Sequence, residues 1–313
     1  MSQSPSFSTP QTHLRDSAKI LKQCNSQKNT KLKKPAWLKI RLSSHKTMQN
    51  IKKQLRDEKL STVCEEASCP NLMECFSKGT ITLMIMGDLC TRRCPFCDVS
   101  HGNPQKLDPN EPAKISDFCN KLKADYVVLT SVNRDDLKDG GASHFASCNQ
   151  SLRDNIKNVL IENLTPDFRK NQNLSLDNLS ISLPDVFNHN IETVENLYKK
   201  VRPGANYKIS LNLLENFKKR HPEIITKSGF MLGLGERDSQ IKRLLRDLKN
   251  IGVDSITIGQ YLQPSLSHLS VKKYITPERF QQWANYATIM GFKNIASAPL
   301  VRSSYNAKNF FKQ

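Results

Sequence analysis

The sequence predicts an α/β fold built on a parallel β-sheet. Short runs rich in β-branched and other apolar residues recur along the chain, and polar or helix-like segments separate most of them. Strands that alternate with helical patterns indicate parallel strands joined by helical crossovers. With 313 residues and 37% hydrophobic content, the chain is long enough to bury one large core of this kind.

Six of these runs are the predicted strands, and helix-like segments lie between them. The strands are expected at 81–87, 125–131, 157–163, 179–185, 229–235 and 254–260, and examples of the helix-like segments are 115–124 and 239–252. In barrels of parallel strands, the chemistry takes place at the C-terminal ends of the strands. Cys90 follows the first predicted strand closely, so we expect the functional site there.

The formal net charge of +18 is concentrated at the N-terminus. Residues 1–60 contain fourteen Lys and Arg against Asp16, Asp57 and Glu58. A solvated arm, a surface that steers an acidic protein partner and an RNA contact are all compatible with this excess. Aromatic residues that could stack on bases are sparse there, with Trp37 nearly alone, so nucleic acid is the less favoured partner.

Targeting signals are weak in this sequence. It has no stretch of about 18 apolar residues that could span a membrane, and residues 1–30 lack the hydrophobic segment of a secretory signal. We therefore expect a cytoplasmic protein without a membrane partner. The same residues are Ser-rich and poor in acids, as in an organelle transit peptide, but they contain a single arginine, Arg15.

The cysteines carry the strongest chemical signal. Six of the nine lie between residues 64 and 97, in two triples spaced C-x4-C-x5-C and C-x3-C-x2-C. Disulfides are disfavoured because intracellular thiols are kept reduced. Structural zinc sites favour paired C-x2-C ligands that give four cysteines. Three thiolates leave one iron of a [4Fe-4S] cluster without a cysteine, so two triples indicate two clusters, each with one distinctive iron.

The second triple, CTRRCPFC at 90–97, resembles the signature of radical S-adenosylmethionine (SAM) enzymes. Together with CEEASCPNLMEC at 64–75, it resembles the lipoyl synthase family of that superfamily. The resemblance extends over about residues 34–308. Its further segments are KPAWLKIRL, TSVNRDDLKDGGASHF, DVFNHNIETVENLYKKVRPGANYKISL, KSGFMLGLGE, TIGQYLQPSLSHLSVKKY and PLVRSSYNA.

The resemblance implies a partial (β/α)6 TIM-like barrel of the radical SAM type with N-terminal and C-terminal extensions. Four parts of the chain are expected on this basis. They are a basic flexible arm at 1–33, an extension carrying the first cysteine triple at 34–80, the barrel at 81–290, and a C-terminal extension with the RSSY motif at 291–313.

The resemblance also implies the activity and the cluster ligands. Lipoyl synthases insert two sulfur atoms at C6 and C8 of a protein-bound octanoyl-lysine. These alkyl carbons have no acidic proton, so a radical derived from SAM is required. Cys90, Cys94 and Cys97 would hold the SAM cluster. An auxiliary cluster that donates the sulfur would be held by the remaining ligands, which are Cys64, Cys69, Cys75 and Ser304.

Several further positions are implied as contacts to SAM. Ser131, Asn133 and Asp135 would lie near its methionine moiety or ribose, although three such groups after a strand are also ordinary loop chemistry. Gly233 would allow close backbone approach and Glu236 would lie near the nucleoside, although the same pattern fits a tightly packed strand end.

Three other side chains have open roles. His189 has a substrate contact or a structural hydrogen bond as alternatives. Arg92 and Arg93 either moderate the charge of the SAM cluster or face solvent.

Partners follow from the same resemblance. They are octanoylated lipoyl carrier domains, of the 2-oxoacid dehydrogenase E2 subunits and the glycine cleavage H protein, a reducing electron donor such as flavodoxin or ferredoxin, and a cluster-repair protein. Two other functions are kept as alternatives. One is a radical SAM methylthiotransferase acting on tRNA, whose upstream cysteines are normally farther apart, and the other is a zinc-binding, non-catalytic nucleic-acid module.

The chain departs from the family pattern at three positions. Asn133 stands where an aspartate is common, Ala298 where a glycine is common, and Asn306 where a histidine is usual. The asparagine argues against any role that needs a charge at position 133. Ala298 and Asn306 touch no predicted cluster ligand, so we expect only modest changes of geometry from them.

Overall fold

The computed structural model describes residues 32–38, 53, 55–58, 60–66, 69, 71, 82–305 and 307–310, with the backbone only at Cys64, Asn309 and Phe310. Cys75, Asn306 and all but the last two residues of the predicted arm at 1–33 lie outside the described residues. The predicted boundaries between the four parts of the chain stay predictions.

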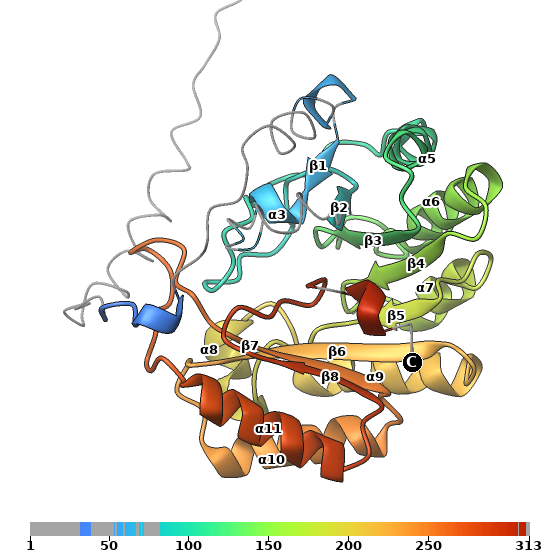
Figure 1. Ribbon diagram of the computed structural model, residues 1–313. Coiled ribbons are helices and arrows are strands. Elements are labelled where there is room, and N and C mark those ends of the chain that lie inside the picture. Colours follow the sequence, from blue (N-terminus) through green and yellow to red (C-terminus); the bar gives the residue numbers. More distant parts are fainter. Residues whose placement is uncertain are drawn as a thin grey trace, which may run out of the picture.

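The fold is organised around a curved sheet whose strands follow one another in chain order (Figure 1). The strands are β1 (Ser61–Thr62), β2 (Thr82–Ile85), β3 (Tyr126–Ser131), β4 (Leu160–Leu164), β5 (Val186–Asn188), β6 (Ile225–Leu232), β7 (Ser255–Gln260) and β8 (Asn294–Ser297). Strand β1 is antiparallel to β2, and every later neighbour is parallel. Parallel neighbours joined by helices confirm the predicted α/β class.

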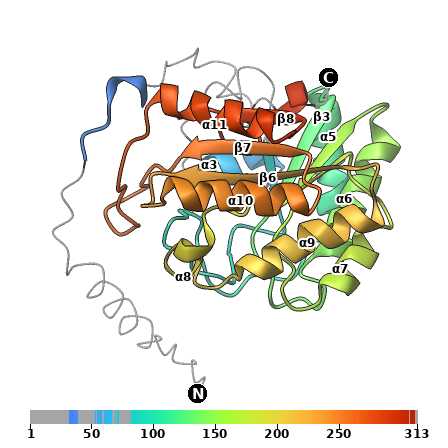
Figure 2. The same cartoon turned by 90° about the horizontal axis from the view of Figure 1, so that it is seen from below.

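Helices lie between the parallel strands in sequence and cover the convex face of the sheet (Figures 1 and 2). They are α5 (Glu111–Lys121), α6 (Ala142–Asn155), α7 (Gln172–Leu179), α8 (Tyr198–Val201), α9 (Tyr207–Arg220), α10 (Asp238–Asn250) and α11 (Pro277–Ile289). Shorter elements are η1 (Ala36–Leu38), α3 (Val63–Glu66), η2 (Glu195–Leu197) and η3 (Ala307–Phe310). None of the helices in the described part of the chain is both long and apolar enough to cross a membrane.

Alternate residues of each strand face two different layers. Ile161 on β4 and Phe187 on β5 belong to the large apolar core shared with the helices, which includes Leu244 of α10. Glu162, next to Ile161, instead pairs with Lys227 of β6 at 2.9 Å, and both side chains are 1% exposed. The concave face of the sheet thus contains a buried ion pair, whereas the convex face is apolar.

Two further side chains donate hydrogen bonds to the Glu162 carboxylate. The hydroxyl of Tyr126 donates to Oε2 over 2.7 Å, and Nδ2 of Asn188 donates to Oε1 over 2.7 Å. A buried carboxylate is tolerated when its charge is paired and its oxygens accept hydrogen bonds, and both conditions are met here.

Five of the six predicted strands overlap observed strands, but the strand predicted at 179–185 is wrong. That segment starts at the last residue of α7, and β5 begins only at Val186. The alternation of Leu179, Ile181 and Leu183 imitates a strand, yet Ile181 is 77% exposed. Leu179 is buried because it continues the helical spacing from Leu176, which the alternation concealed.

Strand β8 was not among the predicted strands. It pairs in parallel with β7 and lies within the predicted C-terminal extension. The predicted helical segments overlap α5 and α10. The helix-covered, mostly parallel sheet is consistent with a partial TIM barrel.

Candidate active site

The loop that carries the second cysteine triple is fixed at the C-terminal end of β2. The amide of Cys90 donates to the carbonyl of Ser100 over 2.8 Å, and the amide of Gly102 donates back to the carbonyl of Cys90 over 3.0 Å. The amide of Thr91 donates to the carbonyl of Asn133 over 3.0 Å. The loop is therefore closed at its base and tied to the segment that follows β3.

The thiol of Cys90 lies among nitrogen donors. Its Sγ is 3.4 Å from the backbone nitrogens of Arg92 and Asn133, and 3.5 Å from Nδ2 of Asn133. Donors of this kind would hydrogen-bond the sulfur of a cluster ligand and hold it in orientation. An amide at position 133 supplies one of them, whereas an aspartate there would place a like charge beside the sulfur.

Cys94 and Cys97 are half-buried in the same loop. Burial raises the pKa of the Cys94 thiol, and it raises the pKa of Cys97 to about 12. The charges of the other cysteines in the loop also raise both pKa values. Coordination to iron deprotonates such thiols outright.

The polar atoms around this loop fit a cluster and a polar ligand. In the described part of the chain no three His, Cys, Asp or Glu side chains converge on a single metal ion. A cluster does not require such convergence, because each thiolate binds a different iron. Oγ of Ser131 and Oδ1 of Asn133 are buried there without a hydrogen-bond partner among the described residues. Asn133 also contacts the sulfur of Cys90, so a polar ligand bound beside the cluster could satisfy its oxygen.

Arg92, between the first two cysteines, is buried and forms a double ion pair. Its Nε and Nη2 contact Asp135 at 2.7 and 2.8 Å, and its Nη1 and Nη2 contact Asp167 at 2.7 and 2.6 Å. Burial by itself would raise the pKa of each carboxyl group, but the hydrogen bonds and charge of Arg92 outweigh it and lower both values. Arg92 thus joins the loop to the segments after β3 and β4, whereas Arg93 is exposed.

The Asp135 carboxylate is engaged by three side chains. Besides Arg92, Arg169 contacts it at 3.1 Å, and Oγ1 of Thr91 lies 3.2 Å away. The structure therefore gives Asp135 a part in holding the cysteine loop. Its predicted contact with SAM stays a prediction, as do those of Ser131 and Asn133.

Gly233 and Glu236 form the turn after β6. The Glu236 carboxylate accepts from the amides of Gly233 and Leu234 over 2.6 and 2.9 Å. Gly233 has a φ of +100°, and a Cβ there would lie 2.2 Å from Nε2 of Gln260, so only glycine fits. The turn lies beside the cysteine loop, because Phe96 packs in one apolar cluster with Leu234.

Glu192 is a site residue that the sequence did not reveal. It lies after β5 with a φ of +66°, and its backbone exchanges hydrogen bonds with Gly229 and Met231, both 2.9 Å. Burial raises the pKa of its carboxyl group, and the charges of Arg202 and Arg302 oppose that rise. Its backbone partners lie on β6 and Arg302 lies in the C-terminal segment, so no local pattern could have identified it.

His189, three residues earlier, has a structural role. Its Nδ1 lies 2.8 Å from the carbonyl of Thr165 and its Nε2 lies 3.0 Å from Oγ of Ser210. Burial lowers the pKa of His189 to about 4. Both ring nitrogens are engaged within the core, which confirms the structural alternative.

The first cysteine triple is described in part, and that part meets the C-terminal segment. Cys64 lies in α3, and Nδ2 of Asn71 donates to the carbonyl of Leu300 over 2.6 Å. The charge of Cys69 acts on the guanidinium of Arg302: burial lowers the pKa of Arg302, and Cys69 opposes this. Segments more than 200 residues apart in sequence are therefore adjacent where the auxiliary cluster was predicted.

The two serines of the RSSY motif differ in their partners. Oγ of Ser303 donates to Oδ1 of Asn190 over 2.6 Å. The hydroxyl of Ser304 makes no hydrogen bond to any residue that the structure describes. Ser304 is the serine left available to another partner.

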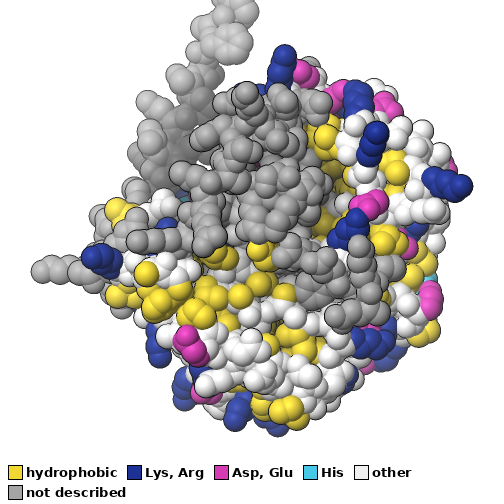
Figure 3. All heavy atoms as spheres, viewed as in Figure 1, with side chains coloured by type: hydrophobic (Ala, Val, Ile, Leu, Met, Phe, Trp, Pro, Cys, Tyr) yellow, Lys and Arg dark blue, Asp and Glu magenta, His cyan; other side chains and the backbone are white. Residues whose placement is uncertain are grey.

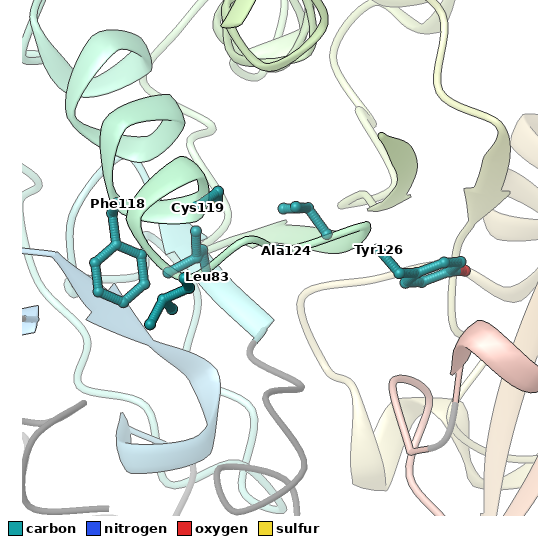
Figure 4. A pocket seen from close by; sticks show the side chains of 7 residues that line it. Leu83, Phe118, Cys119, Ala124 and Tyr126 are labelled. Atoms are coloured by element: carbon teal, nitrogen blue, oxygen red, sulfur yellow. The ribbon is translucent and has the colours of Figure 1, made fainter. Parts of the chain in front are cut away.

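Two of the cysteines outside the triples are core residues. Cys119 and Cys148 are both buried, and burial raises the pKa of Cys119 to about 12. Cys119 lines a small, mostly apolar pocket with Leu83, Phe118 and Tyr126, between α5 and the adjacent strands (Figure 4). Such thiols are inert, so these two cysteines take no part in the site. Cys24, the third, lies outside the described residues.

Comparison with known proteins agrees with this geometry. Residues 84–259 match the family model of the radical SAM superfamily, and residues 7–69 match that of the N-terminal domain of lipoyl synthase of the radical SAM family. Methylornithine synthase is a structural neighbour with a TM-score of 0.53 and 16% identity over 81% of this chain and 72% of that one. The fold and the cysteine loop thus define a radical SAM enzyme, a class that uses SAM and a [4Fe-4S] cluster.

Curated relatives show which family of radical SAM enzymes the chain belongs to. The lipoyl synthase of Coxiella burnetii is 54% identical over 89% of both chains, and that of Psychromonas ingrahamii is 53% identical over 98% of this chain and 97% of its own. The chain belongs to the lipoyl synthase family, whose members are radical SAM sulfurtransferases. The alternative of a tRNA methylthiotransferase is not favoured by these matches.

Proposed function

We propose that this enzyme inserts sulfur at C6 and C8 of an octanoyl group amide-linked to a lysine of a lipoyl carrier domain, and that an auxiliary [4Fe-4S] cluster supplies both sulfurs. The observation that supports this most directly is the contact between the Cys69 region and the RSSY segment. Contact between these two segments is what a cluster with ligands from both of them requires.

The residues divide between two clusters in this proposal. Cys90, Cys94 and Cys97 would hold the SAM cluster, and SAM bound there would supply the radical that this chemistry requires. Cys64, Cys69 and Cys75 hold the auxiliary cluster, with Ser304 as its fourth ligand. A serine oxygen is a hard ligand for iron that normally binds thiolate, so this is the bond expected to open.

Charge around the first cluster is balanced by the protein. The Asn133 amide contacts the sulfur of Cys90, while the charge of Arg92 is paired with Asp135 and Asp167. The main role of Arg92 is therefore to order the cysteine loop. Ser131 and Asn133 offer the orphaned oxygens that a SAM amine could satisfy.

The proposed macromolecular substrates are carrier domains of the 2-oxoacid dehydrogenase E2 subunits and the glycine cleavage H protein. A flavodoxin or ferredoxin would supply electrons, and a repair protein would restore the consumed cluster. On the face shown in Figure 3, the Lys and Arg side chains of the described residues are scattered among acidic ones. The concentrated positive charge of residues 1–60 is therefore the better candidate for attracting an acidic carrier.

The test compares the native chain with a Cys64/Cys69/Cys75→Ala variant after anaerobic reconstitution. About eight irons should fall to about four, with SAM cleavage retained and sulfur insertion into an octanoyl-lysine peptide lost. Cys119→Ala is the matched control and should keep the native iron content. Four irons or fewer in the native protein would overturn the proposal.

A further inference from the structure

The C-terminal segment lies against two glycines of the sheet. A Cβ at Gly259 of β7 would be 2.2 Å from the carbonyl oxygen of Val301 and 3.2 Å from Nη1 of Arg302. A Cβ at Gly229 of β6 would be 2.9 Å from Oγ of Ser303. Contacts this short to backbone do not occur in real structures, so the path of the segment requires glycine at position 259.

Backbone hydrogen bonds hold the start of this segment. The amide of Gln260 donates to the carbonyl of Pro299 over 3.2 Å, and the amide of Ala298 donates to the carbonyl of Ile258 over 3.2 Å. At its other end, Ala307 packs with Tyr126 and Val128 on the concave face of β3. The RSSY motif thus lies between two parts of the segment that are attached to the sheet.

Asn190 makes a side-chain contact to the motif between these anchors. Its Oδ1 accepts from Oγ of Ser303 over 2.6 Å. An amide oxygen can only accept, so the Ser303 hydroxyl is the donor and its proton is committed to Asn190. Nη1 of Arg202 donates to the Asn190 carbonyl over 3.0 Å. The side chain and the backbone of Asn190 are both held.

We propose that Asn190 is the positioning residue that selects the serine ligand of the auxiliary cluster: it holds Ser303 and leaves Ser304 available to iron. This rests on the proposed function, in which Ser304 is that ligand. The bond between Ser303 and Asn190 involves no iron. It would therefore hold the segment in place whether or not Ser304 is bound to iron.

The experiment uses Asn190→Ala, Ser303→Ala, the double variant and Ser304→Ala in the full chain. SAM cleavage, sulfur insertion and iron content are measured for each. The spectrum of the auxiliary cluster is recorded separately in a Cys90/Cys94/Cys97→Ala background, where no SAM cluster contributes. Because SAM cleavage depends on the first cluster, its retention shows that a variant has folded.

Asn190→Ala should reduce sulfur insertion about tenfold or more and alter the auxiliary-cluster spectrum, the effect of one lost buried hydrogen bond. SAM cleavage should change less than about twofold. Ser303→Ala should give the same loss, and the double variant should be no worse than either single variant, because both remove one interaction. Losses that multiply, or native behaviour of both single variants, would overturn the inference.

Ser304→Ala separates this inference from the proposed function. If it keeps the native auxiliary-cluster spectrum and sulfur insertion, the serine ligand itself is wrong. If it loses both while Asn190→Ala and Ser303→Ala behave as native, only the role of Asn190 is wrong. Asn173→Ala, on the exposed face of α7, is the matched control and should be native in every assay.

Discussion

Arg92 and Asp167 form a two-point ion pair between the cysteine loop and the segment after β4. The contacts are 2.7 and 2.6 Å, and the side chains are 3% and 0% exposed. A planar guanidinium that meets two carboxylates fixes orientation as well as distance. The loop that would hold the SAM cluster is therefore ordered by residues that do not bind iron.

Replacing Arg92 by lysine should weaken this order. A lysine cannot pair with two oxygens of both carboxylates at once, so we expect a loss of about 3 kcal/mol in the free energy of unfolding, as for broken buried pairs. The iron content of the SAM cluster should fall as well. Denaturant unfolding and iron analysis measure the two effects. Arg93→Lys, at an exposed position of the same loop, is the control, and an equal effect in both variants would contradict the prediction.

Asp167 should make stability depend on pH in the acid range. Its folded pKa is lowered, since the contacts with Arg92 outweigh burial. Its contribution is therefore complete above the unfolded pKa of about 3.9 and is lost as the pH falls through the folded pKa. Unfolding of cluster-free protein, followed from pH 7 to pH 3, should show a steeper decline for the native chain than for Asp167→Asn. Parallel curves would count against the assignment.

Gly259→Ala should displace the C-terminal segment. The new methyl group would meet the Val301 carbonyl oxygen at 2.2 Å, so the segment must move and the RSSY motif with it. We expect sulfur insertion to be lost, SAM cleavage to be retained, and the segment to become sensitive to limited proteolysis. Gly102→Ala, whose Cβ would meet only Leu89 at 3.9 Å, is the control.

Lys227→Met should destabilise the protein by about 3 to 5 kcal/mol, because it leaves the buried Glu162 carboxylate without its cation. The double variant Glu162→Gln with Lys227→Met should recover much of that loss, since no charge remains. Thermal and denaturant unfolding measure both. If the double variant is less stable than Lys227→Met alone, the broken ion pair is not the cause of the destabilisation.

Removal of residues 1–30 should slow modification of an acidic carrier mainly at low salt. Long-range attraction is screened within about 8 Å at physiological ionic strength, so the difference from the native chain should shrink as salt is added. Initial rates with a carrier domain, and with a short octanoyl-lysine peptide as control substrate, provide the comparison. A salt-independent difference would exclude steering.

The strand and helix pattern was predictable where local signals agreed. β3 and β7 coincide closely with their predicted runs, because β-branched residues fill strands buried on both faces. The failure at 179–185 came from a helix end whose alternation resembled a strand. The second cysteine triple was recognisable because all its ligands lie within eight residues.

Sequence by itself determined the α/β class, the cysteine triples and the family resemblance, since each depends on local spacing and composition. Tertiary structure decided that Arg92 is buried between Asp135 and Asp167, that Glu192 lies near two arginines, and that Asn190 engages Ser303 and not Ser304. Those relationships join residues up to 113 positions apart. They exist only once the sheet has brought the ends of its strands together, because hydrogen bonds and ion pairs act over a few ångströms and not along the chain.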